Sequence, residues 1–345
     1  MTERRKLLQS IAATAADYRV GELGPPTSEH VDRWVSQFDN SVQIGILREM
    51  NHVLDRTYFS LEQVAGFLEM LTKAEKLVGK DPRAFWSGVC FLDIQGGGNS
   101  QREMLELFTE VLRKSCSLNI RDCGKVPSTF IYLDDVIFTG NRVRRDLEEW
   151  IKTDAPADAK LHVVCIALHS GGQYYANDRI RMASRAAGKR LEVTWWRSIQ
   201  LEDQKKNINR SDVLRPAEIP EDVAVKEYVK AMRYSPVLRR PGNVGTKGLF
   251  SSEEGRGLLE QEFLKAGVRI RQICQNLGDT QRPLGHSTLE TLGFGSLIVT
   301  FRNCPNNAPL VLWVGDPWYP LFPRTTNSQT EVRRMFREFT TGGGN

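Results

Sequence analysis

Apolar residues recur every three or four positions through the first 85 residues, and this spacing predicts a helical region. The segment TSEHVDRWVSQF places four large apolar side chains on one helical face behind a Ser/Thr cap: Val31, Trp34, Val35 and Phe38. The next segment, SVQIGILREMNHVLDRTYF, has the same spacing at Val42, Ile46, Met50 and Leu54. We expect these helices to pack on one another and on the region that follows.

Between residues 86 and 200, short apolar runs alternate with helical patterns. Strands are predicted over VCFLDI, TFIYL, AKLHVVCIALHS and RLEVTWW. Helices are predicted from Gln101 onward, after the turn FTGNR, and over QYYANDRIRMASRAAG. This alternation is typical of an α/β fold in which helices cover both faces of a parallel sheet.

Periodicity weakens after residue 200. Residues 200–245 are polar with several prolines, which indicates a boundary or a loop-rich cover. A capped helix is predicted over SSEEGRGLLEQEFLKAGVRIRQI, and two strands over GSLIVTFRNC and APLVLWVGD, joined by the turn NCPNN. The expected domains are a helical region 1–85, an α/β core 86–200, an α+β extension 201–335 and a flexible tail 336–345.

Composition narrows the class of protein. The 345 residues are 40% hydrophobic and 26% charged, which is ordinary for a globular protein, and no apolar run reaches the roughly 18 residues of a membrane-spanning helix. The basic start lacks the continuous apolar stretch of a signal peptide. Six scattered cysteines without a CxxC pair favour a reduced, cytoplasmic protein without structural zinc. The net charge of +5 permits an anionic ligand or nucleic acid without requiring either.

The stretch STFIYLDDVIFTGNRVRRDLEEW carries the clearest candidate chemistry. A buried strand is followed by two acids, Asp134 and Asp135, then by a Thr139–Gly140 turn and a helix. Two adjacent carboxylates suit the vicinal hydroxyls of a ribose, because ionised carboxylates only accept hydrogen bonds. The free amides at the start of the helix suit a phosphate. The alternative is a purely structural role, in which an acidic strand end caps a helix.

An earlier loop falls at the same edge of the predicted sheet. In LDIQGGGNSQ, residues 95–100 follow one strand and precede a helix. Ligands of parallel sheets bind at the carboxyl ends of the strands, where this loop and the Asp-Asp pair both lie. A run of glycines alone is a common turn, but its position before the acids strengthens the functional reading.

YLDDVIFTG resembles the phosphoribosyl pyrophosphate (PRPP) motif of the type I phosphoribosyltransferases, in which an apolar strand leads into Asp-Asp and then Thr-Gly. The resemblance implies a parallel sheet of that family's kind, with the N-terminal helical region and the C-terminal extension added to it. The chain departs from the motif after Thr-Gly, where small residues and a second Thr or Ser are usual. Asn141 and Arg142 stand there, and Arg142 either binds phosphate itself or fills the site and signals lost catalysis.

Carried over residue by residue, the resemblance implies a site for Mg2+ with PRPP or a nucleotide. The pyrophosphate loop comprises Gln95, Gly96, Gly97, Gly98, Asn99 and Ser100. The 5′-phosphate loop comprises Phe138, Thr139, Gly140, Asn141 and Arg142. The implied catalytic residues are Asp134 and Asp135, which also contact the metal, with Arg102 and Lys125 neutralising the pyrophosphate. For Arg102 and Lys125 the alternative is an exposed surface cation, and the short link CSLNIRDCGKVPS puts a water-excluding lid in doubt.

Over residues 30–325 the chain also resembles the phosphoribosyltransferase-like effectors of bacterial antiphage systems, including retrons. That resemblance implies a cytoplasmic toxin effector in an oligomer or complex, partnered by a winged-helix protein and a reverse transcriptase with its RNA and DNA, and no membrane. The activity is either transfer of a phosphoribosyl group or cleavage of a nucleotide's glycosidic bond. The alternative is a catalytically inactive nucleotide-sensing or assembly subunit.

Two further groups have open interpretations. One group is the three asparagines Asn303, Asn306 and Asn307. They either line a pocket for the acceptor substrate or form a hairpin turn, and the turn is favoured. Tyr174 and Tyr175 follow a predicted strand end and either stack on a base or pack within the fold.

Overall fold

The computed structural model describes residues 1–96, 99–124, 127–274 and 276–324. Its contacts divide the chain into two compact units. Unit 1 joins Met1–Ser60 to the chain from Glu202 onward, and unit 2 is Leu61–Leu201. The second boundary lies beside the one expected at residue 200, whereas the helices after Ser60 group with the sheet rather than with the N-terminal helices. The expected boundaries at residues 85 and 335 remain predictions.

Unit 2 is built on a parallel sheet, as the sequence predicts. Its strands are β2 (Val89–Leu92), β3 (Thr129–Leu133), β5 (Asp158–His169) and β6 (Arg190–Leu201), paired in that order. A further short strand, β4 (Val136–Ile137), pairs in parallel with the last part of β5. Because β5 has neighbours on both sides, its last seven residues, 163–169, are buried, which explains the apolar run from Val163 to Leu168.

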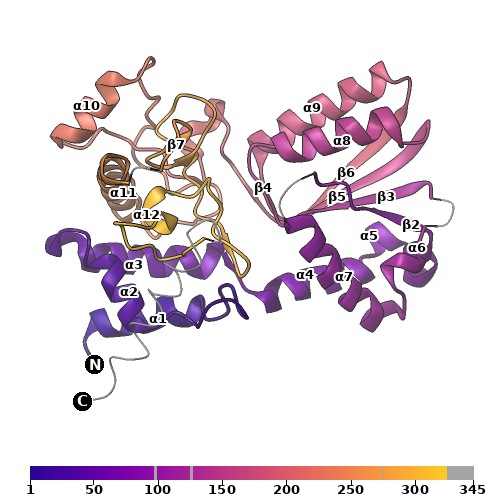
Figure 1. Ribbon diagram of the computed structural model, residues 1–345, viewed down its shortest axis with the longest axis horizontal. Helices are drawn as coiled ribbons and strands as arrows, with labels where there is room; N and C mark the ends of the chain where they lie inside the picture. Colours follow the sequence, from indigo (N-terminus) through magenta and orange to yellow (C-terminus); the bar gives the residue numbers. More distant parts are fainter. Residues whose placement is uncertain (97–98, 125–126, 275, 325–345) are drawn as a thin grey trace. The chain divides into compact units, whose positions relative to one another are not determined.

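Helices cover both faces of this sheet (Figure 1). One face carries α8 (Asn141–Thr153) and α9 (Ser170–Ala186), and the other carries α4 (Leu61–Lys73), α5 (Glu75–Val78), α6 (Pro82–Gly88) and α7 (Ser100–Cys116). Leu147 of α8 and Ile180 of α9 are fully buried against Val163 of β5 in one apolar cluster. Burying each such side chain contributes ~1.5–3 kcal/mol, so the two helices anchor the strand ends that precede them.

Unit 1 is mainly helical at its N-terminal end. The helices α1 (Glu3–Thr14), α2 (Ser28–Val35) and α3 (Asn40–Thr57) pack together, and α11 (Glu253–Ile273) packs on α3. Trp34 and Phe263 meet edge to face between α2 and α11. A two-residue strand, β1 (Tyr58–Phe59), pairs in parallel with β9 (Val299–Thr300). This pairing connects the two chain segments that make up unit 1.

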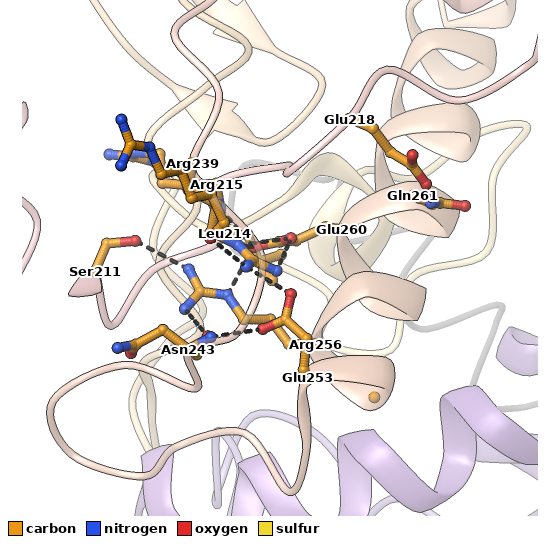
Figure 2. Close-up of polar contacts among 12 residues, drawn as sticks. Ser211, Leu214, Arg215, Glu218, Arg239, Asn243, Glu253, Arg256, Glu260 and Gln261 are labelled. Atoms are coloured by element: carbon orange, nitrogen blue, oxygen red, sulfur yellow. Dashed lines mark hydrogen bonds and ion pairs between the residues drawn. The ribbon is translucent and has the colours of Figure 1, made fainter. Parts of the chain in front are cut away.

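The chain from Glu202 to Ser252 is loop-rich, as its composition predicts, and contains only η2 (Lys205–Arg210) and α10 (Val223–Ala231). Buried charges fix it to α11 (Figure 2). Arg239 and Arg256 both bind the buried carboxylate of Glu260, at 2.7 and 2.8 Å. Arg256 also donates to Ser211 Oγ at 3.0 Å and to the Val213 carbonyl at 3.1 Å. The loop is therefore held by hydrogen-bonded charges rather than by regular backbone pairing.

Of the two strands predicted near the C-terminus, the first is present only as a two-residue strand and the second is wrong. In GSLIVTFRNC only Val299 and Thr300 pair as a strand, and APLVLWVGD contains the short helix α12 (Leu310–Trp313). Both runs are almost wholly buried, so neither shows the alternation that separates strand from helix. A two-stranded antiparallel ribbon of β7 (Gln281–Arg282) and β8 (Gly285–His286) lies earlier in the chain.

No helix in the part of the chain that the structure describes is both long and apolar enough to cross a membrane. The asparagine-rich turn has a structural contact, since buried Asn307 donates to the His286 carbonyl at 3.1 Å. Of the two tyrosines on α9, Tyr174 is 70% exposed, while Tyr175 is half-buried with the Arg179 guanidinium 5.6 Å from its ring centre.

Candidate functional site

The two acids directly follow β3 and precede the short strand β4. The Asp134 amide donates to the Val164 carbonyl at 3.0 Å, and the Ile166 amide donates to the Asp135 carbonyl at 2.8 Å. A strand therefore ends at the acids, as expected, and pairing with β5 resumes in β4. β5 holds the backbone of both acids between these two strands.

The two carboxylates have different environments. Asp134 is 4% exposed and its Oδ1 accepts a hydrogen bond from the Asp135 amide at 2.9 Å. Burial, followed by the negative charge of Asp135, raises the pKa of Asp134 from 3.8 to about 7, against the opposing effects of the Ser100 hydroxyl and the Arg142 charge. Asp135 is half-buried and its Oδ1 accepts from the Val136 amide at 2.7 Å. At neutral pH the Asp134 carboxyl is therefore only partly ionised.

The loop after the acids is packed very closely. Gly140 has φ +74°, a conformation that favours glycine, and the Thr139 hydroxyl accepts from the Asn141 amide at 3.4 Å. Gly172 at the start of α9 lies directly against the Phe138 carbonyl, and a Cβ at Gly172 would overlap that oxygen. The first turn of α9 therefore fixes the position of the residues that lead into α8.

His169 supports the same loop from the end of β5. Its ring is fully buried and stacks on Phe138 with 5.0 Å between ring centres, and its Nδ1 lies 3.1 Å from the Ile137 carbonyl. Arg142 is exposed in the first turn of α8. Its guanidinium is thus available to solvent and to a ligand rather than buried within the loop.

The structure brings the glycine loop to the acids through two glutamines. The Gln95 Nε2 lies 3.5 Å from Asp134 Oδ2, at the long limit of a hydrogen bond. The Gln101 Oε1 accepts from the amides of Ile94 and Gln95 at 2.8 and 2.9 Å. Gly96, Asn99 and Ser100 complete the described part of this loop; Gly97, Gly98 and the predicted Lys125 lie outside the described residues. Arg102 is exposed on the first turn of α7.

Sequence reasoning missed several residues that shape this site. They are Gln101, Tyr132, Asp146, His169 and Gly172. The buried Tyr132 hydroxyl donates to Asp146 Oδ2 at 2.7 Å, and burial raises the pKa of both groups. Tyr132 could have been found from the alternation of β3, which places it on the same face as Asp134. No sequence signal connects Asp146 or Gln101 to the acids.

The residues of this site suit a magnesium ion that binds together with a substrate. Among the described residues, no group of three or more His, Cys, Asp or Glu side chains is arranged to hold a metal ion. Mg2+ typically binds one or two carboxylates and takes its remaining ligands from water and substrate phosphates. Asp134 and Asp135 provide that number of carboxylates, and the other ligands would come from the substrate.

Comparison with known proteins gives one clear result. No match was found among curated proteins or among solved structures. The family model PRTase-CE matches residues 31–324, which cover all of unit 2, with the glycine loop and the Asp-Asp pair, and most of unit 1. The chain therefore belongs to the PRTase-CE family and is a phosphoribosyltransferase-like protein.

Proposed function

We propose that unit 2 binds PRPP or a nucleotide with Mg2+ and transfers or cleaves its ribose 5-phosphate group. The observation that carries this proposal is the arrangement around Asp134. A buried acid and its half-exposed neighbour stand between a glycine loop, reached through Gln95, and a tightly packed helix-start loop at Gly140. This order of anion loop, acid pair and anion loop suits a pyrophosphate, a ribose and a 5′-phosphate.

Each element has a physical role in this proposal. Asp135 accepts hydrogen bonds from the ribose hydroxyls, and Asp134 fixes the backbone of that acid through its amide. The first-turn amides of α8 bind the 5′-phosphate, and the exposed Arg142 adds a positive charge to it. Bound Mg2+ would neutralise the charge that develops on the pyrophosphate.

The reaction breaks the bond between the ribose C1 and its leaving group, which departs with the bonding electrons. A base or other nucleophile then bonds to C1 in a transfer, and water does so in a cleavage. The developing positive charge at C1 is stabilised by the nearby carboxylates. Both outcomes use the same binding geometry, so the acceptor decides between transferase and glycosidase activity.

A second candidate is a nucleotide-sensing or assembly subunit without catalysis. It is favoured by Arg142, a long cation where the family motif has a small residue. Either candidate is compatible with a place in an antiphage system beside a winged-helix protein and a reverse transcriptase. That placement predicts that co-expressed partners change the toxicity of the chain.

Calorimetric titration with PRPP and Mg2+, repeated with common nucleotides, tests the proposal. We expect magnesium-dependent binding that is lost in the double variant Asp134→Asn/Asp135→Asn. The matched control is Glu148→Gln/Glu149→Gln, which removes the same number of adjacent acids from α8 and should bind normally. Wild-type binding in the Asp134/Asp135 variant would refute the ribose site. Binding without turnover against any acceptor or water would favour the sensing subunit.

A further inference from the structure

One buried side chain connects the two loops of the candidate site. Gln101 lies in the first turn of α7 and is 1% exposed. Its Oε1 accepts from the amides of Ile94 and Gln95, at 2.8 and 2.9 Å, where the chain leaves β2. Its Nε2 donates to the carbonyl of Leu133 at 3.4 Å, immediately before Asp134. One side-chain amide therefore joins the end of β2 to the end of β3.

The side chain of Gln95 supports this connection with further hydrogen bonds. Its Oε1 accepts from the Ser100 hydroxyl at 3.1 Å and from the Gln101 amide at 3.2 Å. Because two donors hold the oxygen, the amide nitrogen has to point the other way, toward Asp134 Oδ2 at 3.5 Å. The entry and exit of the glycine loop are thereby closed on each other and directed at the acids.

The connection differs from ordinary sheet pairing. β2 and β3 are paired in register from Val89 opposite Thr129 to Leu92 opposite Tyr132, and the ladder ends there. Beyond that point the backbones diverge into their separate loops. Gln101 replaces the missing backbone pairing with side-chain hydrogen bonds at the place where the two ligand-binding loops begin.

We propose that Gln101 is a positioning residue that couples the glycine loop to the Asp134–Asp135 loop, so that occupation of one loop prepares the other. This inference rests on the proposed function, since it treats the two loops as binding two halves of one ligand. A ligand fragment bound by the residues at the two ends of the glycine loop holds Ile94 and Gln95 in place. Gln101 transmits this order to Leu133 and hence to the acids.

Coupling between two half-ligands is the measurement that a merely structural role would not change. The probes are ribose 5-phosphate and inorganic pyrophosphate with Mg2+. The dissociation constant of ribose 5-phosphate is measured by calorimetry with and without saturating pyrophosphate. We expect pyrophosphate to tighten ribose 5-phosphate binding about threefold to tenfold in the wild type, the range of one net hydrogen bond. In Gln101→Met this factor should fall to about one, even where the individual affinities change.

Two further variants keep the test decisive. Gln101→Glu retains an acceptor for the Ile94 and Gln95 amides but loses the donor to Leu133, so it should fold and still lose the coupling. Gln43→Met is the matched control, because Gln43 is 5% exposed and donates to the Phe38 carbonyl at 2.8 Å in unit 1. It should lower stability and leave the coupling factor unchanged. An unchanged factor in both Gln101 variants would overturn the inference.

A ligand-free measurement separates this inference from the proposed function. If the wild type binds neither probe, the proposed function fails, and hydrogen exchange then decides whether the two loops are coupled. Gln101→Met should accelerate exchange at Ile94 and Gln95 and also at Asp134 and Asp135. Acceleration at Ile94 and Gln95 alone would show that Gln101 caps the glycine loop and does not couple it to the acids.

Discussion

The buried carboxyl of Asp134 should make a contribution to stability that is smaller at neutral pH than at acidic pH in the ligand-free protein. Its pKa is 3.8 in an ordinary environment and about 7 in the fold. Between these values the unfolded chain has released the proton and the folded protein still holds it. The folded state binds this proton more tightly, so the contribution of Asp134 to the free energy of unfolding falls as the pH rises from about 4 to about 7 and is level above that.

The variant Asp134→Asn removes this penalty. The rise in pKa corresponds to ~4 kcal/mol of destabilisation of the ionised carboxylate, caused first by burial and then by the charge of Asp135. Asparagine keeps the acceptor for the Asp135 amide, but its nitrogen would face the Gln95 nitrogen, which costs ~1 kcal/mol. We therefore expect Asp134→Asn to be ~3 kcal/mol more stable than the wild type at pH 8, with no gain near pH 4.

Urea denaturation of both proteins without ligand, at several pH values from 4 to 8, measures this difference. Asp135→Asn is the informative control. It removes the charge that helps to raise the Asp134 pKa, so the pH range over which stability falls should move to lower values. A constant difference between Asp134→Asn and wild type across the whole range would refute the reasoning, as would a variant that is less stable at pH 8.

Two predictions concern the surrounding packing. Gly172→Ala should weaken PRPP binding at least tenfold, because the added Cβ would overlap the Phe138 carbonyl. The control Gly66→Ala, which has open space at the Cβ position, should bind PRPP normally. Equal affinities of the two variants in titration would contradict the packing argument. Arg256→Met should lower the free energy of unfolding by ~3–5 kcal/mol, because it leaves the fully buried Glu260 short of one partner. A loss below ~1 kcal/mol in urea denaturation would mean that Arg239 and the Arg215 amide satisfy Glu260 without Arg256.

The sheet of unit 2 was predictable because the apolar runs of its strands and the periodicity of the helices between them indicate the same fold. Its strands are apolar and bounded by helices with clear periodicity, and parallel order follows from that alternation. The C-terminal runs around Val299 and Leu310 were not predictable, since burial on every side removes the periodic signal. The loop from Glu202 to Ser252 also gave no periodic signal, because buried charges from α11 hold it in place.

The amino-acid sequence by itself determined which chemical groups are present at the carboxyl edge of the sheet. The order of glycine loop, Asp134–Asp135 and Thr139–Gly140 is local, and short-range backbone physics is enough to place each group after its strand. Only the tertiary structure decided that Asp134 is buried while its neighbour Asp135 is half-exposed. It also decided that Gln101 connects the glycine loop to the loop of the two acids. It also decided that Gly172 supports the phosphate loop. These features depend on contacts between residues about 30 to 40 positions apart, which periodicity and motif spacing do not encode.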